Sequence, residues 1–169
     1  MPGSQTMKYH RAPWSPLLKT VSWLSTGLLL GISLIPWLIG KQFPAFLHWG
    51  IILLPAIILL ICACFTVRGY TLGTDAILVQ RLFWSTRLSR AGLKAARFEP
   101  GVMRSSIRTC GNCGLFSFSG YYRNQNLGSY RAWVTDLSRT VVLQYADHTV
   151  VVSPESPEDF VRELSETAG

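Results

Sequence analysis

Charged side chains are scarce in this 169-residue chain, at 15% of the sequence, whereas a soluble globular domain carries about 25%. The first 74 positions contain no acidic residue, and two stretches there, 21 and 26 residues long, carry no formal charge. Hydrophobic side chains make up 49% of the chain. This composition excludes a disordered or collagen-like chain and argues against a purely soluble protein. It agrees with a membrane anchor joined to a small soluble domain.

The sequence also lacks a set of residues typical of catalysis. It shows no nucleophile with a nearby base, no paired buried carboxylates and no glycine loop of the kind that cradles phosphate. Gly111, Gly114 and Gly120 are not spaced as G-x-G-x-x-G. We therefore expect a protein that is not an enzyme and that uses no cofactor, metal or small-molecule substrate.

The two uncharged stretches predict a transmembrane helical hairpin over residues 21–67, with spans at about 21–40 and 43–65. A bilayer core about 30 Å thick needs roughly 20 apolar residues in a helix, and both stretches are long enough. Residues 40–42 alone connect them, so the hairpin is tight. A cleaved signal peptide fits less well, because a second apolar stretch follows the first almost at once. Gly27 and Gly31 form a G-x-x-x-G pattern, which allows close packing within the hairpin or against a second copy.

Basic residues predict the orientation of the hairpin. They precede the first span within a basic N-terminal segment, residues 1–20, and they follow the second span, whereas the connection has Lys41 alone. The flanking residues are Lys8, Arg11 and Lys19 before the hairpin and Arg68, Arg81 and Arg87 after it. Because basic residues collect on the cytoplasmic side, we expect a multi-pass protein with both termini in the cytoplasm.

From Arg68 onwards, short β-rich runs alternate with turns. Strands are predicted at residues 69–72, 76–83, 95–99, 115–122, 129–135, 140–145 and 149–153. Ser156, Pro157 and the acidic residues after them mark the start of a helix at about 157–166. A helix this short must pack on the sheet to persist in water. Residues 68–169 are thus expected to form an α+β domain, a mainly antiparallel barrel or roll capped by a C-terminal helix.

The order and spacing of several features in residues 70–164 resemble a bacterial pleckstrin-homology-like (PH-like) domain. These features are Tyr70-Thr71-Leu72 with Asp75, residues 108–111 leading to 114–116, Gly120, Gly128, Thr135, Ser153-Pro154 and residues 157–160. The resemblance implies a seven-stranded bent sheet with a C-terminal helix, a role in interaction and a place at the bacterial inner membrane. PH domains that bind phosphoinositides have a basic first hairpin loop. Here that loop, residues 73–75, is short and acidic, so a specific phosphoinositide pocket is not expected.

A basic block in the middle of the chain is the main candidate for binding. Residues 75–134 hold nine basic and two acidic side chains, whereas residues 135–169 hold two basic and seven acidic ones. Near a membrane, each basic residue contributes on the order of 1 kcal/mol to binding anionic headgroups. The candidate membrane- or partner-facing residues are Arg81, Arg87, Arg90, Lys94, Arg97, Arg104 and Arg108. The alternative is an ordinary basic bias on solvated strands. The membrane tether and the acidic tail argue against a nucleic-acid partner.

Cys110 and Cys113 form a C-x-x-C pattern. Such a pair can be a redox site, half of a zinc site or incidental. A zinc site needs two more ligands, and the remaining cysteines, Cys62 and Cys64, lie at membrane depth. The glycines around the pair favour a tight turn with incidental thiols, and a reversible disulfide is the alternative.

The sequence therefore predicts a membrane-anchored PH-like interaction module at the cytoplasmic face. Its partners are the lipid bilayer, as an anchor and as an anionic surface, and a protein partner or a second copy of the chain. Two alternatives stay open. One is a small subunit of a membrane complex that acts through its hairpin, and the other is a thiol redox protein that uses Cys110 and Cys113.

Overall fold

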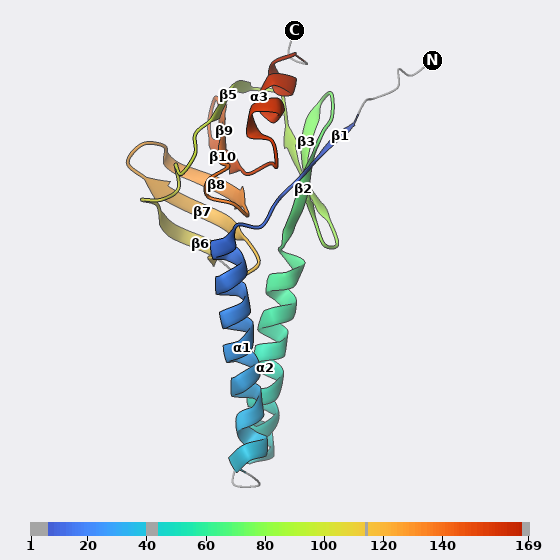
Figure 1. The fold of residues 1–169 in the computed structure, drawn as a ribbon, viewed down its shortest axis with the longest axis vertical. Helices are drawn as coiled ribbons and strands as arrows, with labels where there is room; N and C mark the ends of the chain where they lie inside the picture. Colours follow the sequence, from blue (N-terminus) through green and yellow to red (C-terminus); the bar gives the residue numbers. More distant parts are fainter. Residues whose placement is uncertain (1–6, 40–43, 114, 167–169) are drawn as a thin grey trace.

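The computed structural model describes residues 7–39, 44–113 and 115–166, with the backbone alone at Asn112 and Cys113. Two long helices lie side by side as a hairpin, and a β domain lies at one end of them (Figure 1). The predicted connection at residues 40–42 is outside the described residues. Both helices join the β domain at the same end, so the hairpin projects from it as a single stalk.

The stalk consists of α1 (Pro16–Ile39) and α2 (Ala45–Cys64). At about 1.5 Å per residue, these helices are roughly 36 and 30 Å long, close to the thickness of a bilayer core. Both are long and apolar enough to cross a membrane, as the sequence predicts. α1 begins earlier than the predicted residue 21 because Ser15 caps it: the Ser15 hydroxyl oxygen accepts a hydrogen bond from the Leu18 amide at 3.1 Å.

Among the described residues, the first sheet has the order β1-β2-β3-β4. Its strands are β1 (Lys8–Arg11), β2 (Val67–Leu72), β3 (Ala76–Arg81) and β4 (Ser85–Ser89). The β2–β3 hairpin was predicted, but β1 was not. β1 pairs antiparallel with β2, with Lys8 opposite Leu72 and Arg11 opposite Gly69. The segments that enter and leave the stalk are therefore held together by a β ladder.

The second sheet, within the described part of the chain, has the order β5-β9-β10-β8-β7-β6. Its pairings are antiparallel except for a parallel one between β8 and β10. The strands are β5 (Leu93–Phe98), β6 (Ile107–Cys113), β7 (Phe118–Asn124), β8 (Gly128–Val134), β9 (Val141–Tyr145) and β10 (Thr149–Val152). The C-terminal helix α3 (Pro157–Glu166) follows, and its predicted bounds are confirmed.

Besides β1, two strands of the β domain, β4 and β6, were not predicted, and the resulting count differs from the implied seven. β4 has little alternation of apolar and polar residues, since Leu88 is its one buried side chain. The tight turn predicted at residues 110–113 is wrong, because they lie in β6. Gly111 pairs with Gly120 of β7, and both have positive φ values, 118° and 147°. Between Val67 and Val152, the described residues form nine strands in two sheets.

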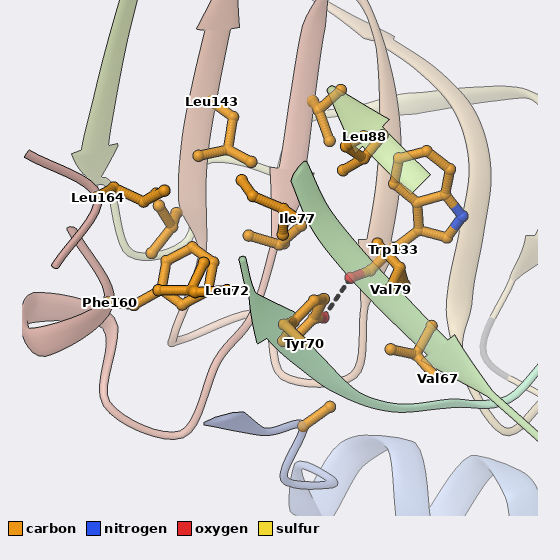
Figure 2. Packing of buried hydrophobic residues seen from close by; sticks show 14 of the residues in the cluster. Val67, Tyr70, Leu72, Ile77, Val79, Leu88, Trp133, Leu143, Phe160 and Leu164 are labelled. Atoms are coloured by element: carbon orange, nitrogen blue, oxygen red, sulfur yellow. Dashed lines mark hydrogen bonds between the residues drawn. The ribbon is translucent and has the colours of Figure 1, made fainter. Parts of the chain in front are cut away.

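The core lies between the sheets and under α3, and Tyr70 links them (Figure 2). Its hydroxyl donates a hydrogen bond to the Trp133 carbonyl oxygen at 2.5 Å and accepts one from the Ser153 amide at 3.0 Å. Complete burial raises the pKa of Tyr70 to about 12. Phe160 of α3 packs edge-on against the Tyr70 ring, with centroids 6.1 Å apart. One tyrosine of β2 thus joins the first sheet, the second sheet and the helix.

The two ends of the β domain have different neighbours. We call the end that meets the stalk the proximal end; it holds Ser15, Phe65, the β3–β4 turn at residues 82–84 and the loop at 115–117. The opposite end, which we call the distal end, holds the β2–β3 turn at residues 73–75 and α3 (Figure 1).

Candidate functional site

One face of the first turns of α1 packs against the proximal end. Leu18 has no exposed surface and Ser22 is 3% exposed, whereas most of the helix beyond them is exposed. The Ser22 hydroxyl accepts a hydrogen bond from the Phe116 amide at 3.0 Å. The Ser15 amide donates to the Thr135 carbonyl oxygen at 3.1 Å. The largely exposed, apolar part of α1 therefore begins after about Ser22, near the start predicted for the span.

The end of α2 contacts both sheets. The Phe65 carbonyl oxygen accepts a hydrogen bond from the Ser117 hydroxyl at 3.4 Å. The Phe65 ring lies edge-on to Trp84, with centroids 5.2 Å apart. β2 begins at Val67, two residues after Phe65. These contacts leave no linker between the stalk and the β domain, so the proximal end lies at the level where α2 ends.

The β3–β4 turn carries Leu82, Phe83 and Trp84, which are 41%, 71% and 42% exposed. The Arg81 amide donates to the Trp84 carbonyl oxygen at 2.9 Å, which closes the turn. Residues 76–83 were predicted as one strand, but β3 ends at Arg81. Turns are normally built from glycine, proline and small polar residues. Three bulky apolar residues are therefore unusual in a turn and indicate a functional surface. The sequence contains this signal, but it was missed because residues 82 and 83 were predicted as part of a strand.

A pocket of about 420 Å³ lies between the two sheets and the last turn of α2. α2 and the residue after it contribute Ile61, Cys62 and Phe65; the first sheet contributes Arg81; the second contributes Cys110, Gly111, Ser119, Gly120, Tyr121, Arg131 and Trp133. Its surface is mostly apolar and aromatic, and its two formal charges are both positive.

Arg81, at the end of β3, is half-buried against aromatic rings. Its guanidinium carbon lies 5.4 Å from the Phe65 ring centroid and 5.6 Å from that of Trp84. The Nε atom is buried and has no hydrogen-bond partner among the described residues. Burial, and then the charge of Arg131, lower the pKa of the Arg81 guanidinium. Arg81 thus has an unused hydrogen-bond donor directed into protein rather than water.

Arg131 of β8 faces the same pocket. Its guanidinium carbon lies 4.5 Å from the Trp133 ring centroid and 5.3 Å from that of Tyr121. Neither Arg81 nor Arg131 forms an ion pair with a described carboxylate. Arg131 was not among the predicted residues. Its alternation with Trp133, which places both on one face of a strand, was the available signal.

The glycine pair of β6 and β7 forms one wall of the pocket. A Cβ atom on Gly111 would lie 2.3 Å from the Ser119 carbonyl oxygen, and one on Gly120 would lie 2.2 Å from that of Cys110. Both distances are impossible for real atoms, so only glycine lets these backbones approach so closely.

Two guanidinium groups that line one mainly apolar pocket repel each other, and the half-buried Arg81 also loses hydration, whereas Arg131 is exposed. A guanidinium is a planar fork of N–H donors that matches phosphate or carboxylate oxygens. Apolar surface from Ile61 and Phe65 adjoins these charges. The arrangement therefore fits an anionic group attached to an apolar body.

The structure does not bring the predicted basic residues together. Of the seven, Arg81 alone lines the pocket. Arg90 donates to the carbonyl oxygens of Gly73 and Leu164 at the distal end, and Arg97 pairs with Glu99 at 3.4 Å. Arg108 donates to the Gly111 carbonyl oxygen at 2.9 Å, beside the pocket wall. The others, Arg87, Lys94 and Arg104, are exposed on separate segments.

The cysteine pair stays a prediction. Cys110 is exposed and lines the pocket, and the Cys113 side chain is outside the described residues. Among the side chains that the structure describes, which do not include Cys113, no three histidine, cysteine or acidic residues are placed to hold a metal ion.

The family of bacterial PH domains matches residues 68–168, more than half of the chain. That segment runs from the second residue of β2 past the end of α3. No curated protein and no solved structure matches the chain. Domains of this type are typically interaction modules that bind lipids or proteins rather than catalysts. The chain belongs to the bacterial PH domain family, with one strand and two long apolar helices placed before the domain.

Proposed function

We propose that this protein is a membrane-anchored interaction module that holds its PH-like domain against the cytoplasmic face of the bacterial inner membrane, where it binds the anionic lipid surface. The observation that carries this proposal is the exposed apolar turn of Leu82, Phe83 and Trp84, at the level where α2 ends. Aromatic side chains favour the headgroup level of a bilayer. A turn placed there inserts its rings among headgroups, which holds the proximal end on the surface.

Aromatic residues along the stalk support a bilayer-spanning hairpin. Trp23 is exposed near the proximal end of α1, and Trp37 is exposed near its other end. They are separated by roughly 21 Å along the helix. Trp37 and Trp49 both lie near His48, with ring centroids 6.1 and 6.0 Å apart. Two aromatic bands that bracket an apolar stretch are typical of transmembrane helices.

The distribution of charge supports the cytoplasmic orientation. The start of α1 and the end of α2 both adjoin the β domain. Every basic residue of the segments that flank the hairpin therefore lies on the domain side. These residues are Lys8, Arg11, Lys19, Arg68, Arg81 and Arg87. Lys41 is the one charge in the connection between the spans. The positive-inside rule assigns the richer side to the cytoplasm.

An environment-sensitive fluorophore on the turn tests the proposal. Full-length protein in vesicles is labelled at Phe83→Cys or, as matched control, at Thr74→Cys in the distal β2–β3 turn, with the native cysteines replaced by alanine. We expect quenching by lipid-borne quenchers at position 83 and by aqueous quenchers at position 74. Equal aqueous quenching at both positions would contradict seating of the domain on the bilayer.

A second candidate, a subunit that acts through its hairpin, is favoured by the glycines of α1. A Cβ atom on Gly27 or Gly31 would meet no atom within 4 Å, so the predicted packing of these residues inside the hairpin is wrong and their face of α1 is free for a neighbour. Gly31→Leu in the full chain is expected to abolish cross-linking between copies or to a membrane partner. Unchanged cross-linking would contradict this candidate.

A further inference from the structure

We propose that the pocket between Arg81 and Arg131 binds the phosphate of an anionic phospholipid from the adjoining leaflet. This inference rests on the proposed function, since it needs the proximal end to lie in the headgroup layer, and it names the ligand that this layer supplies. Binding of one lipid phosphate in a defined pocket differs from the general attraction of a basic protein to a charged surface.

The charges of the pocket point to an anion. Arg81 and Arg131 line one cavity, and neither has a carboxylate partner among the described residues. Each is in contact with two aromatic rings, which hold the guanidinium groups in place. The buried Nε of Arg81 is an unsatisfied donor in the described structure. Buried donors are rarely left without an acceptor, and a phosphate oxygen would supply one after a small shift of the Arg81 side chain.

The position of the pocket points to a lipid rather than to a free anion. Ile61 and Phe65 form its membrane side, and Phe65 also contacts Trp84 of the exposed turn. A phosphate in this pocket would have the lipid-facing surface of α2 directly beside it. A lipid can then extend its acyl chains along α2 while its phosphate contacts the arginines. A soluble phosphate would leave the apolar wall uncovered.

The proposed level of the pocket, in the headgroup layer, also disfavours a protein side chain as the natural occupant. A carboxylate or a phosphorylated residue of a soluble partner would have to enter the headgroup layer beside the last turn of α2. Lipid phosphates are already there at high local concentration. Capture of a peptide anion is therefore an outcome that the test must be able to reveal.

Native mass spectrometry of the full chain in detergent micelles tests the proposal, with phosphatidylglycerol, phosphatidylcholine and glycerol 3-phosphate as probes. We expect phosphatidylglycerol to bind at least about tenfold more tightly than phosphatidylcholine. The variant Arg81→Gln/Arg131→Gln should lose at least about tenfold in phosphatidylglycerol affinity, as expected for charge-assisted hydrogen bonds. The matched control Lys94→Gln/Arg104→Gln removes the same charge from exposed positions outside the pocket and should change affinity by less than about twofold.

Several results would overturn the proposal. One is equal affinity for the two phospholipids. Others are an unchanged phosphatidylglycerol affinity in the pocket variant, or an equal loss of affinity in the control variant. Displacement of the lipid by glycerol 3-phosphate or by an acidic peptide at similar concentration would also overturn it. Arg131→Lys provides a check that does not depend on folding of the double variant: it keeps the charge, loses the planar fork and should weaken binding partly. A failure here, with lipid quenching at position 83 intact, would leave the proposed function standing.

Discussion

Arginines at the two ends of the β domain have different surroundings. At the distal end, Arg90 donates to the carbonyl oxygens of Gly73 at 3.0 Å and Leu164 at 2.9 Å. At the proximal end, Arg81 and Arg131 contact aromatic rings and pair with no described carboxylate. Arg90 therefore serves the fold, whereas the side chains of Arg81 and Arg131 have contacts with rings instead, which is why we propose that they bind a ligand. The groups that an arginine side chain contacts in the folded chain, rather than its position in the sequence, distinguish a structural arginine from a candidate binding one.

The aromatic residues differ in the same way. Phe160 of α3 has no exposed surface and packs on His10 and Tyr70. Phe83 of the β3–β4 turn is 71% exposed. Phe160 at the distal end is thus part of the core, whereas Phe83 at the proximal end, which we propose faces the membrane, is exposed.

The largest expected effect separates these two phenylalanines. Phe160→Ala should lower the free energy of unfolding of the β domain by about 3–5 kcal/mol, because it leaves a cavity under α3. Phe83→Ala should change it by less than about 0.5 kcal/mol in detergent. Denaturant unfolding followed by near-ultraviolet circular dichroism measures both. Similar losses in the two variants would mean that the turn is part of the core.

Tyr70 links the two sheets, and its ionisation should therefore destabilise the β domain. Burial raises its pKa to about 12 from an ordinary value of 10.0, so the folded state favours the neutral phenol. The associated stability is present in full below about pH 10 and is lost as pH rises to about 12, about 2–3 kcal/mol in all. Unfolding measured across this range should show the loss in the wild type. Tyr70→Phe should reduce its steepness, and an identical pH profile in that variant would exclude Tyr70 as the cause.

Single substitutions of the arginines sharpen the comparison further. Arg90→Gln should destabilise the domain by about 1–3 kcal/mol, since it removes two charge-assisted, partly buried hydrogen bonds to carbonyl groups. Arg81→Gln should cost less than about 1 kcal/mol or stabilise the domain in lipid-free detergent, because it removes an unsatisfied donor and the repulsion with Arg131. Thermal unfolding of both variants tests the order. If Arg81→Gln is the more damaging change, Arg81 serves the fold.

The smallest expected effect concerns the contact between β1 and α3 at the distal end. Glu163 accepts hydrogen bonds from Lys8 and from His10 Nε2, the latter at 3.0 Å. Burial alone would raise the pKa of Glu163, but these hydrogen bonds lower it below its ordinary 4.5. The stability it provides is therefore present above about pH 4.5 and is lost as pH falls. Glu163→Gln should cost roughly 1 kcal/mol at neutral pH and reduce the acid dependence of unfolding.

Much of the fold was predictable because its signals are local. The uncharged stretches predicted α1 and α2, and Ser156 with Pro157 predicted α3 at its observed bounds. β1 was not predictable in this way, because its four residues pair with residues of β2 that lie 58 to 64 positions away in the chain. The error at residues 110–113 arose because glycine signals turns and close backbone approach alike, and only the pairing of Gly111 with Gly120 distinguishes them.

The candidate site was only partly predictable. The basic block contained Arg81, but charge counting could not distinguish it from Arg90, whose acceptors at Gly73 and Leu164 exist only in the folded chain. Arg131 was not predicted as a site residue because it belongs to a strand that is distant in sequence from Arg81. The apolar turn at residues 82–84 was visible in the sequence, but its exposure and its contact with Phe65 depend on how β3 and α2 meet.

The most direct test of the account is the distance between lipid phosphorus and the guanidinium carbons of full-length protein in phosphatidylglycerol vesicles, measured by ¹³C–³¹P dipolar dephasing in solid-state NMR. We predict dephasing that corresponds to about 4–5 Å, the separation of a hydrogen-bonded guanidinium and phosphate. This dephasing should weaken in Arg81→Lys/Arg131→Lys and persist in Arg90→Lys. Dephasing that is absent in the wild type, or that disappears only with Arg90, would show that the proximal end of the domain does not contact the headgroups.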